Sequence, residues 1–212
     1  MASRNGVSSR SRLAPREGLI KHEETPVTED LSGLNAVRVA IVSDTHGHLC
    51  SDVQAIVEGC DVAVHAGDIG SRRVLDVLQA GAGKVVAVRG NNDLPGLWSG
   101  DELDALDRVP SVAEIRLPGG MLAVEHGHVH GQSSPDLGKL RAAHPDARVI
   151  VYGHTHKQLV DRTQQPWVLN PGAAGRIRND GGPSCLVLHA TADTWEVDLF
   201  KFPRVAARRR SE

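Results

Sequence analysis

The stretch VRVAIVSDTHGH (37–48) starts with apolar, mostly β-branched residues and ends in one carboxylate and two imidazoles. A short apolar run closed by polar residues is typical of a buried strand. DVAVHAGD (61–68) and KVVAVRGNND (84–93) repeat this pattern. Helical spacing separates the three runs, at residues 50–60 and 71–83. The first half of the chain therefore predicts a parallel βαβαβ unit.

The pattern changes after this unit. Residues 111–128 predict a hairpin around Pro118-Gly119-Gly120, and residues 135–145 predict a helix that ends at Pro145. A strand at 148–154 follows. The remaining apolar segments predict short antiparallel strands: KQLVDR, QPWVLNPG, CLVLHA and TWEVDLF. A parallel first half is thus followed by a mixed or antiparallel second half within one α/β domain.

Composition divides the chain into three parts. Residues 1–35 are rich in Ser, Arg, Glu and Pro without an apolar period, so we expect a disordered N-terminal extension. Residues 36–203 form the expected folded domain, and residues 204–212 form a short basic C-terminal tail. No apolar run is long enough to cross a bilayer and no segment resembles a secretory signal, so the expected location is the cytoplasm.

Charge and cysteine content restrict the function classes. The net charge of -2 gives no general attraction to nucleic acid or to an anionic membrane. Nucleic acid is therefore not favoured as a partner, although the basic C-terminal tail is one feature that speaks for it. No membrane partner is expected. The 3 cysteines form no CxxC pair, which fits a reducing compartment.

Polar clusters follow five predicted strands at their C-terminal ends. In open α/β sheets, ligands bind at this edge, so we expect the five loops to converge there. Their nitrogen and oxygen donors suit Mn, Fe, Ni, Zn or Co better than Ca or Mg. The clusters are Asp44-Thr45-His46-Gly47-His48, Gly67-Asp68, Gly90-Asn91-Asn92-Asp93, His126-Gly127-His128 and Gly153-His154-Thr155-His156.

Two of these clusters carry donors two residues apart, Asp44 with His46 and His154 with His156. Alternate residues of an extended backbone share a face, so each pair is expected to hold one metal or to flank two. Each motif alone also fits an ordinary turn, cap or surface histidine. The occurrence of all five in order, each at the end of a strand, favours a common site.

This ordered set resembles the calcineurin-like metallophosphoesterase superfamily, with motifs D-x-H, G-D, G-N-x-D/E, H-G-H and G-H-x-H. Over about residues 37–200 it is most similar to the small bacterial and archaeal phosphodiesterase branch. The resemblance implies an αββα sandwich of two mixed β-sheets flanked by helices. It also implies two divalent metal ions, Mn²⁺ first, with Ni²⁺, Fe²⁺, Zn²⁺ or Co²⁺ as alternatives. The implied ligands are Asp44, His46, Asp68 and His156 for one ion, and Asp68, Asn91, His126 and His154 for the other, with Asp68 bridging.

The activity implied is that of a phosphodiesterase of small substrates, in which a hydroxide that bridges the metals attacks phosphorus in line. A phosphomonoesterase or a nuclease of the same fold is the alternative, and a protein-binding scaffold ranks lower because all seven ligand positions are intact. A monoester would need further cations, for which Arg89, Arg176 and Arg178 are candidates. We expect the loop 93–107 to shape the pocket and Trp98 to pack within it rather than to stack on a base.

One departure from the superfamily pattern bears on proton transfer, while two others, Gln158 and Ala173, concern loop shape. Asn92 stands where many members have the histidine that protonates the leaving group, and an amide cannot do so at neutral pH. Without this histidine, we expect the enzyme to prefer substrates with good leaving groups, or to use another residue as the acid. His48 and His128 are the candidate catalytic residues for this step, and a plain substrate contact explains each equally well. Asp93 is expected to orient a neighbouring group, and Asn170-Pro171-Gly172 to support the site.

Overall fold

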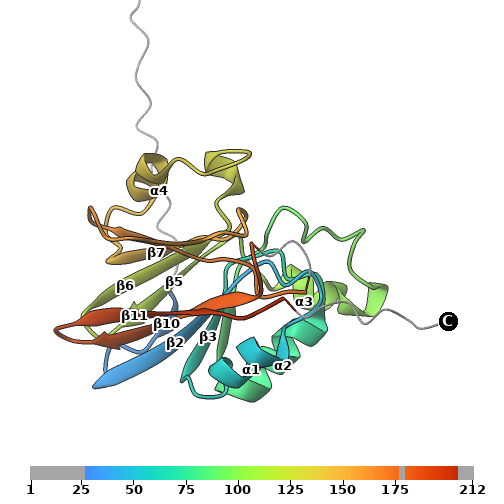
Figure 1. Cartoon of the computed structure of the whole chain (residues 1–212), viewed down its shortest axis with the longest axis horizontal. Helices are drawn as coiled ribbons and strands as arrows, with labels where there is room; N and C mark the ends of the chain where they lie inside the picture. Colours follow the sequence, from blue (N-terminus) through green and yellow to red (C-terminus); the bar gives the residue numbers. More distant parts are fainter. Residues whose placement is uncertain (1–26, 177–179, 205–212) are drawn as a thin grey trace, which may run out of the picture.

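A computed structural model of the chain describes residues 27–176 and 180–204. These residues form two mixed β-sheets that pack face to face, with helices on both outer sides (Figure 1). The αββα sandwich is thereby confirmed. The six-stranded sheet has the order β1 (Val27–Asp30), β5 (Val112–Leu117), β6 (Gly120–Glu125), β7 (Val149–Val151), β9 (Trp167–Pro171) and β8 (Gln158–Asp161). The five-stranded sheet has the order β11 (Trp195–Lys201), β10 (Ser184–Thr191), β2 (Ala36–Val42), β3 (Val62–His65) and β4 (Val85–Ala87).

The helices cover the two outer faces. α1 (Ser51–Val57), α2 (Arg72–Ala82) and α3 (Leu103–Asp107) lie on the side of the five-stranded sheet, and α4 (Leu137–Ala143) lies on the six-stranded sheet (Figure 1). Two short 3₁₀ turns are η1 (Gly100–Glu102) and η2 (His128–His130). The limits of α2 follow from its sequence: the Ser71 side chain caps its start, and Gly83, at φ 72°, ends it.

Aliphatic side chains build the core. Val39, Ile41, Val64 and Leu186 from one sheet meet Ile115 and neighbouring residues of the other in the layer between the sheets. Two smaller layers lie beneath the helices on either outer side. The low aromatic content is thus compensated by β-branched residues, which fit the pleated surfaces.

The strand directions bring the polar loops to one edge. β2, β3 and β4 are parallel, as predicted, and β6, β7 and β9 are parallel in the other sheet. The carboxyl ends of β2, β3 and β4 therefore face the same way, and backbone bonds such as Asp44 N to Gly67 O (3.0 Å) join their loops. We call this side of the sandwich the carboxyl edge.

Two expectations from the sequence were wrong in detail. Residues 27–30, placed in the disordered extension, form β1, which pairs in parallel with β5 and is tied by a 2.6 Å ion pair between Glu29 and Lys84. Four residues are too few to show an apolar period, so the strand was missed. The loop 93–107 contains η1 and α3. Residues 1–26 of the predicted extension and the basic tail beyond Arg204 lie outside the described residues.

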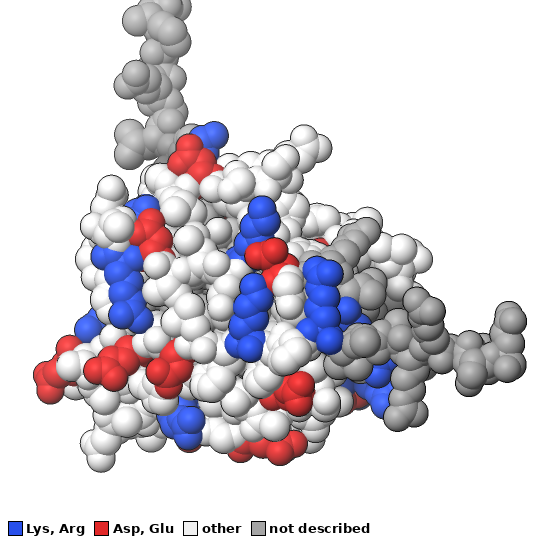
Figure 2. Space-filling model, viewed as in Figure 1, with Lys and Arg blue, Asp and Glu red and all other residues white. Residues whose placement is uncertain are grey.

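The surface mixes charges of both signs. Figure 2 shows Lys and Arg side chains interspersed with Asp and Glu on the face in view. Within the described part of the chain, none of the helices has the length and apolar character needed to span a membrane.

Candidate metal centre

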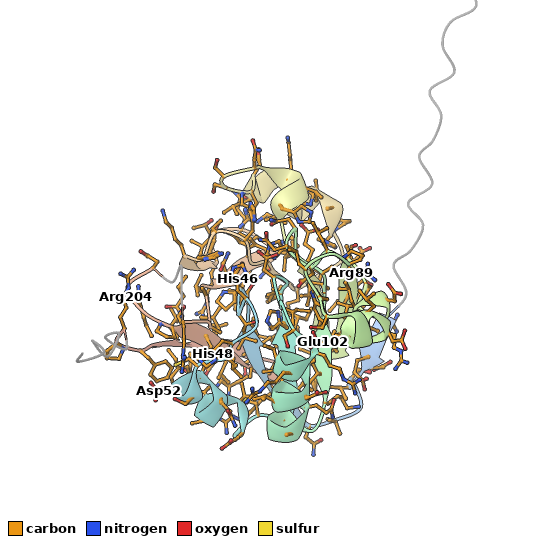
Figure 3. All side chains as sticks on the ribbon, turned by 90° about the vertical axis from the view of Figure 1, so that its right-hand side faces the viewer. His46, His48, Asp52, Arg89, Glu102 and Arg204 are labelled. Atoms are coloured by element: carbon orange, nitrogen blue, oxygen red, sulfur yellow. The ribbon has the colours of Figure 1, made fainter. Side chains whose placement is uncertain are left out.

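The seven predicted ligands meet at the carboxyl edge. Figure 3 looks onto this side of the molecule, with His46 near the middle of the face and His48 close below it. The structure arranges the ligands as two groups. In the first, donor atoms of four side chains all lie within 4.8 Å of one another, namely those of Asp44, His46, Asp68 and His156.

The first group has the features of a cation site. His46 Nε2 and His156 Nε2 face each other at 3.4 Å, and His156 Nε2 lies 3.2 Å from Asp44 Oδ1. The other oxygen, Asp44 Oδ2, accepts from Ser43 Oγ at 2.7 Å and from the backbone N–H of His154 at 3.1 Å. Asp44 Oδ1 is buried and accepts no hydrogen bond from any described residue. A buried carboxylate oxygen beside two imidazole nitrogens fits a divalent ion.

The second group is fixed by two backbone carbonyls. His126 Nδ1 lies 2.7 Å from Ala66 O, and His154 Nε2 lies 2.9 Å from Gln132 O. A carbonyl only accepts, so these nitrogens carry the hydrogens and the other nitrogen of each neutral ring presents a lone pair. Both lone pairs point at Asn91 Oδ1, at 3.1 Å from His126 and 3.0 Å from His154. Three acceptors that converge in this way fit a second cation.

Asp68 lies between the two groups. Its Oδ1 is 3.5 Å from His126 Nε2 and its Oδ2 is 3.9 Å from His46 Nε2. Asn92 holds it in place, since the backbone N–H donates to Oδ1 at 2.8 Å and Nδ2 donates to Oδ2 at 2.6 Å. Burial alone would raise the pKa of Asp68, but His126, the Asn92 bonds and His46 more than offset this and lower it. The carboxylate is therefore ionised between the groups.

Backbone conformation singles out the same residues. Five non-glycine residues have positive φ among the described residues, and all five are predicted ligands: Asp44 (53°), His46 (46°), Asp68 (56°), His154 (68°) and His156 (57°). Such conformations are strained and cluster at functional sites. The reasoning from extended backbone was therefore wrong, because both pairs lie in left-handed turns. His154 and His156 consequently separate, one into each group.

Glycines allow the loops to approach one another. A Cβ at Gly90 would overlap Asp68 Oδ1, and a Cβ at Gly153 would overlap Ser43 Oγ. The glycines of the G-N and G-H motifs are thus required by close packing beside the ligands.

Comparison with known proteins identifies the family. The calcineurin-like phosphoesterase superfamily domain matches residues 37–193. The chain belongs to this superfamily. It is accordingly a metal-dependent phosphoester hydrolase.

Two relatives come from Methanocaldococcus jannaschii. Phosphodiesterase MJ0936 is 26% identical over 147 residues, which cover 64% of this chain and 83% of that protein. The probable metallophosphoesterase MJ0623 is 30% identical over 142 residues, 64% of this chain and 67% of that protein. Vacuolar protein sorting 29 of Cryptosporidium parvum shares the fold, with a TM-score of 0.63, 19% identity, and coverage of 80% of this chain and 100% of that one.

Of the two candidate catalytic histidines of this phosphoesterase, His128 lies beside the second group. The His128 ring is 5.5 Å from that of His126 and 6.2 Å from that of His154, centre to centre. Its Nδ1 finds no hydrogen-bond partner among the residues that the structure describes. Burial, followed by the neighbouring histidines, lowers the pKa of His128. The pKa of His48 is lowered by burial and then by Arg176 and Arg73.

Asp93 touches the loops and not the two groups of ligands. Its Oδ2 accepts from the backbone N–H of Gly90 (2.8 Å) and Ile69 (3.1 Å), and its Oδ1 accepts from that of Gly70 (2.9 Å) and from Trp98 Nε1 (3.3 Å). Asp93 therefore joins the second and third loops of the phosphoesterase site. Trp98 is only 5% exposed and packs in the core beneath α3, which rules out stacking on a substrate base in this conformation.

The arginine candidates have different surroundings. Arg89, a candidate cation for the monoesterase alternative, donates through Nε to Val109 O and through Nη2 to Leu106 O, both at 2.7 Å. Arg176 follows Gly175, which packs against the backbone of Thr45. Arg178 lies outside the described residues.

Two supporting residues, His65 and Gln132, were not predicted from the sequence. His65 is fully buried under the first two loops: its Nδ1 accepts from Gly67 N (3.2 Å) and its Nε2 bonds Thr45 Oγ1 (2.8 Å). Burial lowers the pKa of His65 to about 4. Asn170, by contrast, was expected to support the site, and its Nδ2 donates to Gly153 O of the G-H-x-H loop at 2.6 Å. The position of His65 inside an apolar strand was the one sequence feature that could have revealed its role. No sequence feature indicates the role of the Gln132 carbonyl, because every residue has one.

Proposed function

We propose that this phosphoesterase is a dinuclear phosphodiesterase that acts on small phosphodiesters. The observation that carries the proposal is the pair of acceptor groups that share Asp68. Each group brings imidazole nitrogens together with carboxylate or amide oxygens, and each suits a borderline divalent ion. Mn²⁺ is the ion we propose first, in keeping with carboxylate and imidazole donors and the absence of thiolates among the seven ligands.

In this proposal, one ion is held by Asp44, His46, Asp68 and His156, and the other by Asp68, Asn91, His126 and His154. Bound divalent ions supply Lewis acidity, which activates water as a nucleophile and neutralises the phosphoryl oxygens.

The residues of the chain prepare the ligands for this chemistry. The carbonyls of Ala66 and Gln132 keep the His126 and His154 rings in the tautomers that present a lone pair to the site. Ser43 occupies the second oxygen of Asp44, which leaves Oδ1 for an ion. These hydrogen bonds hold the ligands in place before a metal arrives.

The proposed mechanism has no dedicated acid at the position where many relatives have a histidine that protonates the leaving group. The Asn92 amide is turned onto Asp68 and cannot serve as an acid. His128, which lies beside the second group, is the acid that we propose, with His48 as the alternative. An enzyme with this arrangement favours substrates whose leaving group needs little protonation.

Several observations favour diesters over the alternatives. The similar protein of M. jannaschii is named a phosphodiesterase. A monoester dianion would need an extra cation, and Arg89 is engaged by α3. A nuclease would benefit from a continuous basic surface, whereas the chain has a net charge of -2. A scaffold would have no need of five strained ligand residues.

The deciding experiment compares bis-p-nitrophenyl phosphate with p-nitrophenyl phosphate. Metal is first removed, and Mn²⁺, Ni²⁺, Zn²⁺ or Mg²⁺ is then added back. We expect metal-dependent cleavage of the diester, saturating at two ions per chain, with the monoester slower. No cleavage with any metal would refute the proposal, and a faster monoester would replace it by a phosphomonoesterase.

A matched pair of variants tests the shared carboxylate. Asp68→Asn removes the charge between the two groups and should abolish turnover and weaken both ions. Asp198→Asn removes an exposed carboxylate that pairs with His189 on the surface and should leave activity unchanged. Activity retained in Asp68→Asn would exclude the dinuclear site.

A further inference from the structure

A second histidine–carboxylate cluster lies next to the site and contains none of the seven ligands. Glu125, the last residue of β6, is buried, and each of its oxygens faces one imidazole. Oε1 lies 2.9 Å from His130 Nε2, and Oε2 lies 3.0 Å from His144 Nε2. His130 belongs to η2 and His144 ends α4, so one carboxylate joins three elements. We call these three residues the Glu125 cluster.

The contacts of the Glu125 cluster hold β6, η2 and α4 together. His144 Nε2 forms a hydrogen bond to Oε2 at 3.0 Å, whereas His130 Nε2 faces Oε1 as an ion-pair contact at 2.9 Å without the geometry of a hydrogen bond. Buried hydrogen bonds to a charged carboxylate are among the stronger ones in a protein. The cluster thus fixes His130 relative to β6 and α4.

His130 in turn closes the loop that follows the His126 ligand. Its backbone N–H donates to Gly127 O at 3.0 Å, and its carbonyl accepts from Asp136 N at 3.2 Å. The backbone of His130 therefore closes residues 127–136, and its side chain ties this loop to Glu125. Gln132 lies two residues further along this loop, and its carbonyl accepts from His154 Nε2 at 2.9 Å.

We infer that the Glu125 cluster positions the second metal group, because it holds the loop whose Gln132 carbonyl fixes the tautomer and orientation of His154. His130 and His144 are positioning residues in this view. The inference rests on the proposed function for its catalytic meaning. Its structural content, the link from His130 to the His154 ring, stands independently of any activity.

The direct test observes the His154 ring. Imidazole ¹H–¹⁵N correlation spectra of the full chain, in EDTA and at a pH where the rings are neutral, report which nitrogen carries the hydrogen. We expect a single Nε2–H tautomer for His154 in the wild type. His130→Ala should convert it to a mixture of tautomers, whereas His130→Gln, whose amide can still donate to Glu125, should restore the wild-type signal. His189→Ala removes an exposed histidine of a similar pair with Asp198 and should change nothing at His154.

Zn²⁺ titration of the same variants gives the second readout. Loss of a residue that orients a ligand typically weakens metal affinity about 10-fold or more. We expect His130→Ala and His144→Ala to weaken one of the two Zn²⁺ ions by about 10-fold and to leave the other nearly unchanged. General damage to the fold would weaken both ions alike and would overturn the inference.

The outcomes separate this inference from the proposed function. An unchanged His154 spectrum in His130→Ala overturns the inference, even if the wild type binds two ions and cleaves diesters. A wild type that binds fewer than two ions and cleaves no phosphoester refutes the proposed function, while a tautomer change in His130→Ala would still support the link to His154.

Discussion

His65 should make the stability of the metal-free protein depend on pH. The ring is fully buried, and its contacts define a neutral tautomer in which Nδ1 accepts from Gly67 N and Nε2 donates to Thr45 Oγ1. Protonation would place a hydrogen against the Gly67 N–H and a charge on a fully buried ring. Burial accordingly lowers the pKa of His65 from 6.5 to about 4.

The direction and size of the change in stability follow from the difference between the pKa of His65 in the folded and in the unfolded chain. The unfolded chain takes up a proton at this ring as the pH falls through 6.5, but the folded protein does so only near pH 4. Stability is therefore full above pH 6.5, falls as the pH is lowered through that window, and levels off below it. At about 1.4 kcal/mol per pKa unit, the free energy of unfolding should drop by about 2 kcal/mol between pH 7 and pH 5 because of this residue alone.

Urea unfolding of the wild type and of His65→Gln, in EDTA, measures this contribution. EDTA is needed because metal binding to the ligands is itself pH-dependent. The variant is expected to be less stable at pH 7 but to lose about 2 kcal/mol less on going to pH 5. His189→Gln, which removes an exposed histidine of β10, should follow the wild-type curve. Parallel curves for the wild type and His65→Gln would show that His65 is not held neutral, and the reasoning would fail.

Three further changes test other parts of the site. Asn92→Ala removes the 2.6 Å bond to Asp68 and should weaken Mn²⁺ binding about 10-fold by calorimetry; unaltered affinity would contradict a supporting role. His128→Ala should slow diesters with poor leaving groups more than bis-p-nitrophenyl phosphate if it donates the proton, whereas an equal loss would indicate positioning. Asp93→Asn turns an N–H₂ toward a backbone N–H and should cost about 1–3 kcal/mol in urea unfolding, and a variant as stable as the wild type would show that the loop bonds of Asp93 matter little.

The fold could be predicted from the sequence because each strand and helix is specified by residues that are close together in the chain. The apolar runs at 37–42 and 61–66 have few alternatives to buried parallel strands, and the helical segments between them supply the crossovers. All seven ligand positions lie at the ends of such strands, and the architecture brings strand ends together. β1 and α3 escaped prediction because a strand of four residues and a helix of five carry too little periodicity.

What the sequence could not provide was the way each ligand is oriented. The tautomers of His126 and His154 depend on the carbonyls of Ala66 and Gln132, which any residue type supplies. The role of Arg89 depends on the position of α3, which packs its carbonyls against the guanidinium. Such contacts join segments that are distant in the chain and follow only from the tertiary structure.

The spacing of the D-T-H and H-T-H motifs has a common physical reason. In each motif the two outer residues have positive φ, and the middle threonine bonds a neighbouring loop. Thr45 Oγ1 donates to Ile69 O at 2.9 Å, and Thr155 Oγ1 accepts from Asn170 Nδ2 at 3.1 Å. A left-handed residue costs about 1–2 kcal/mol, so two of them around one threonine persist only where the surrounding bonds hold the turn. The ligands are therefore two residues apart because the threonine anchors the turn from within, and not because a pleated strand presents them on one face.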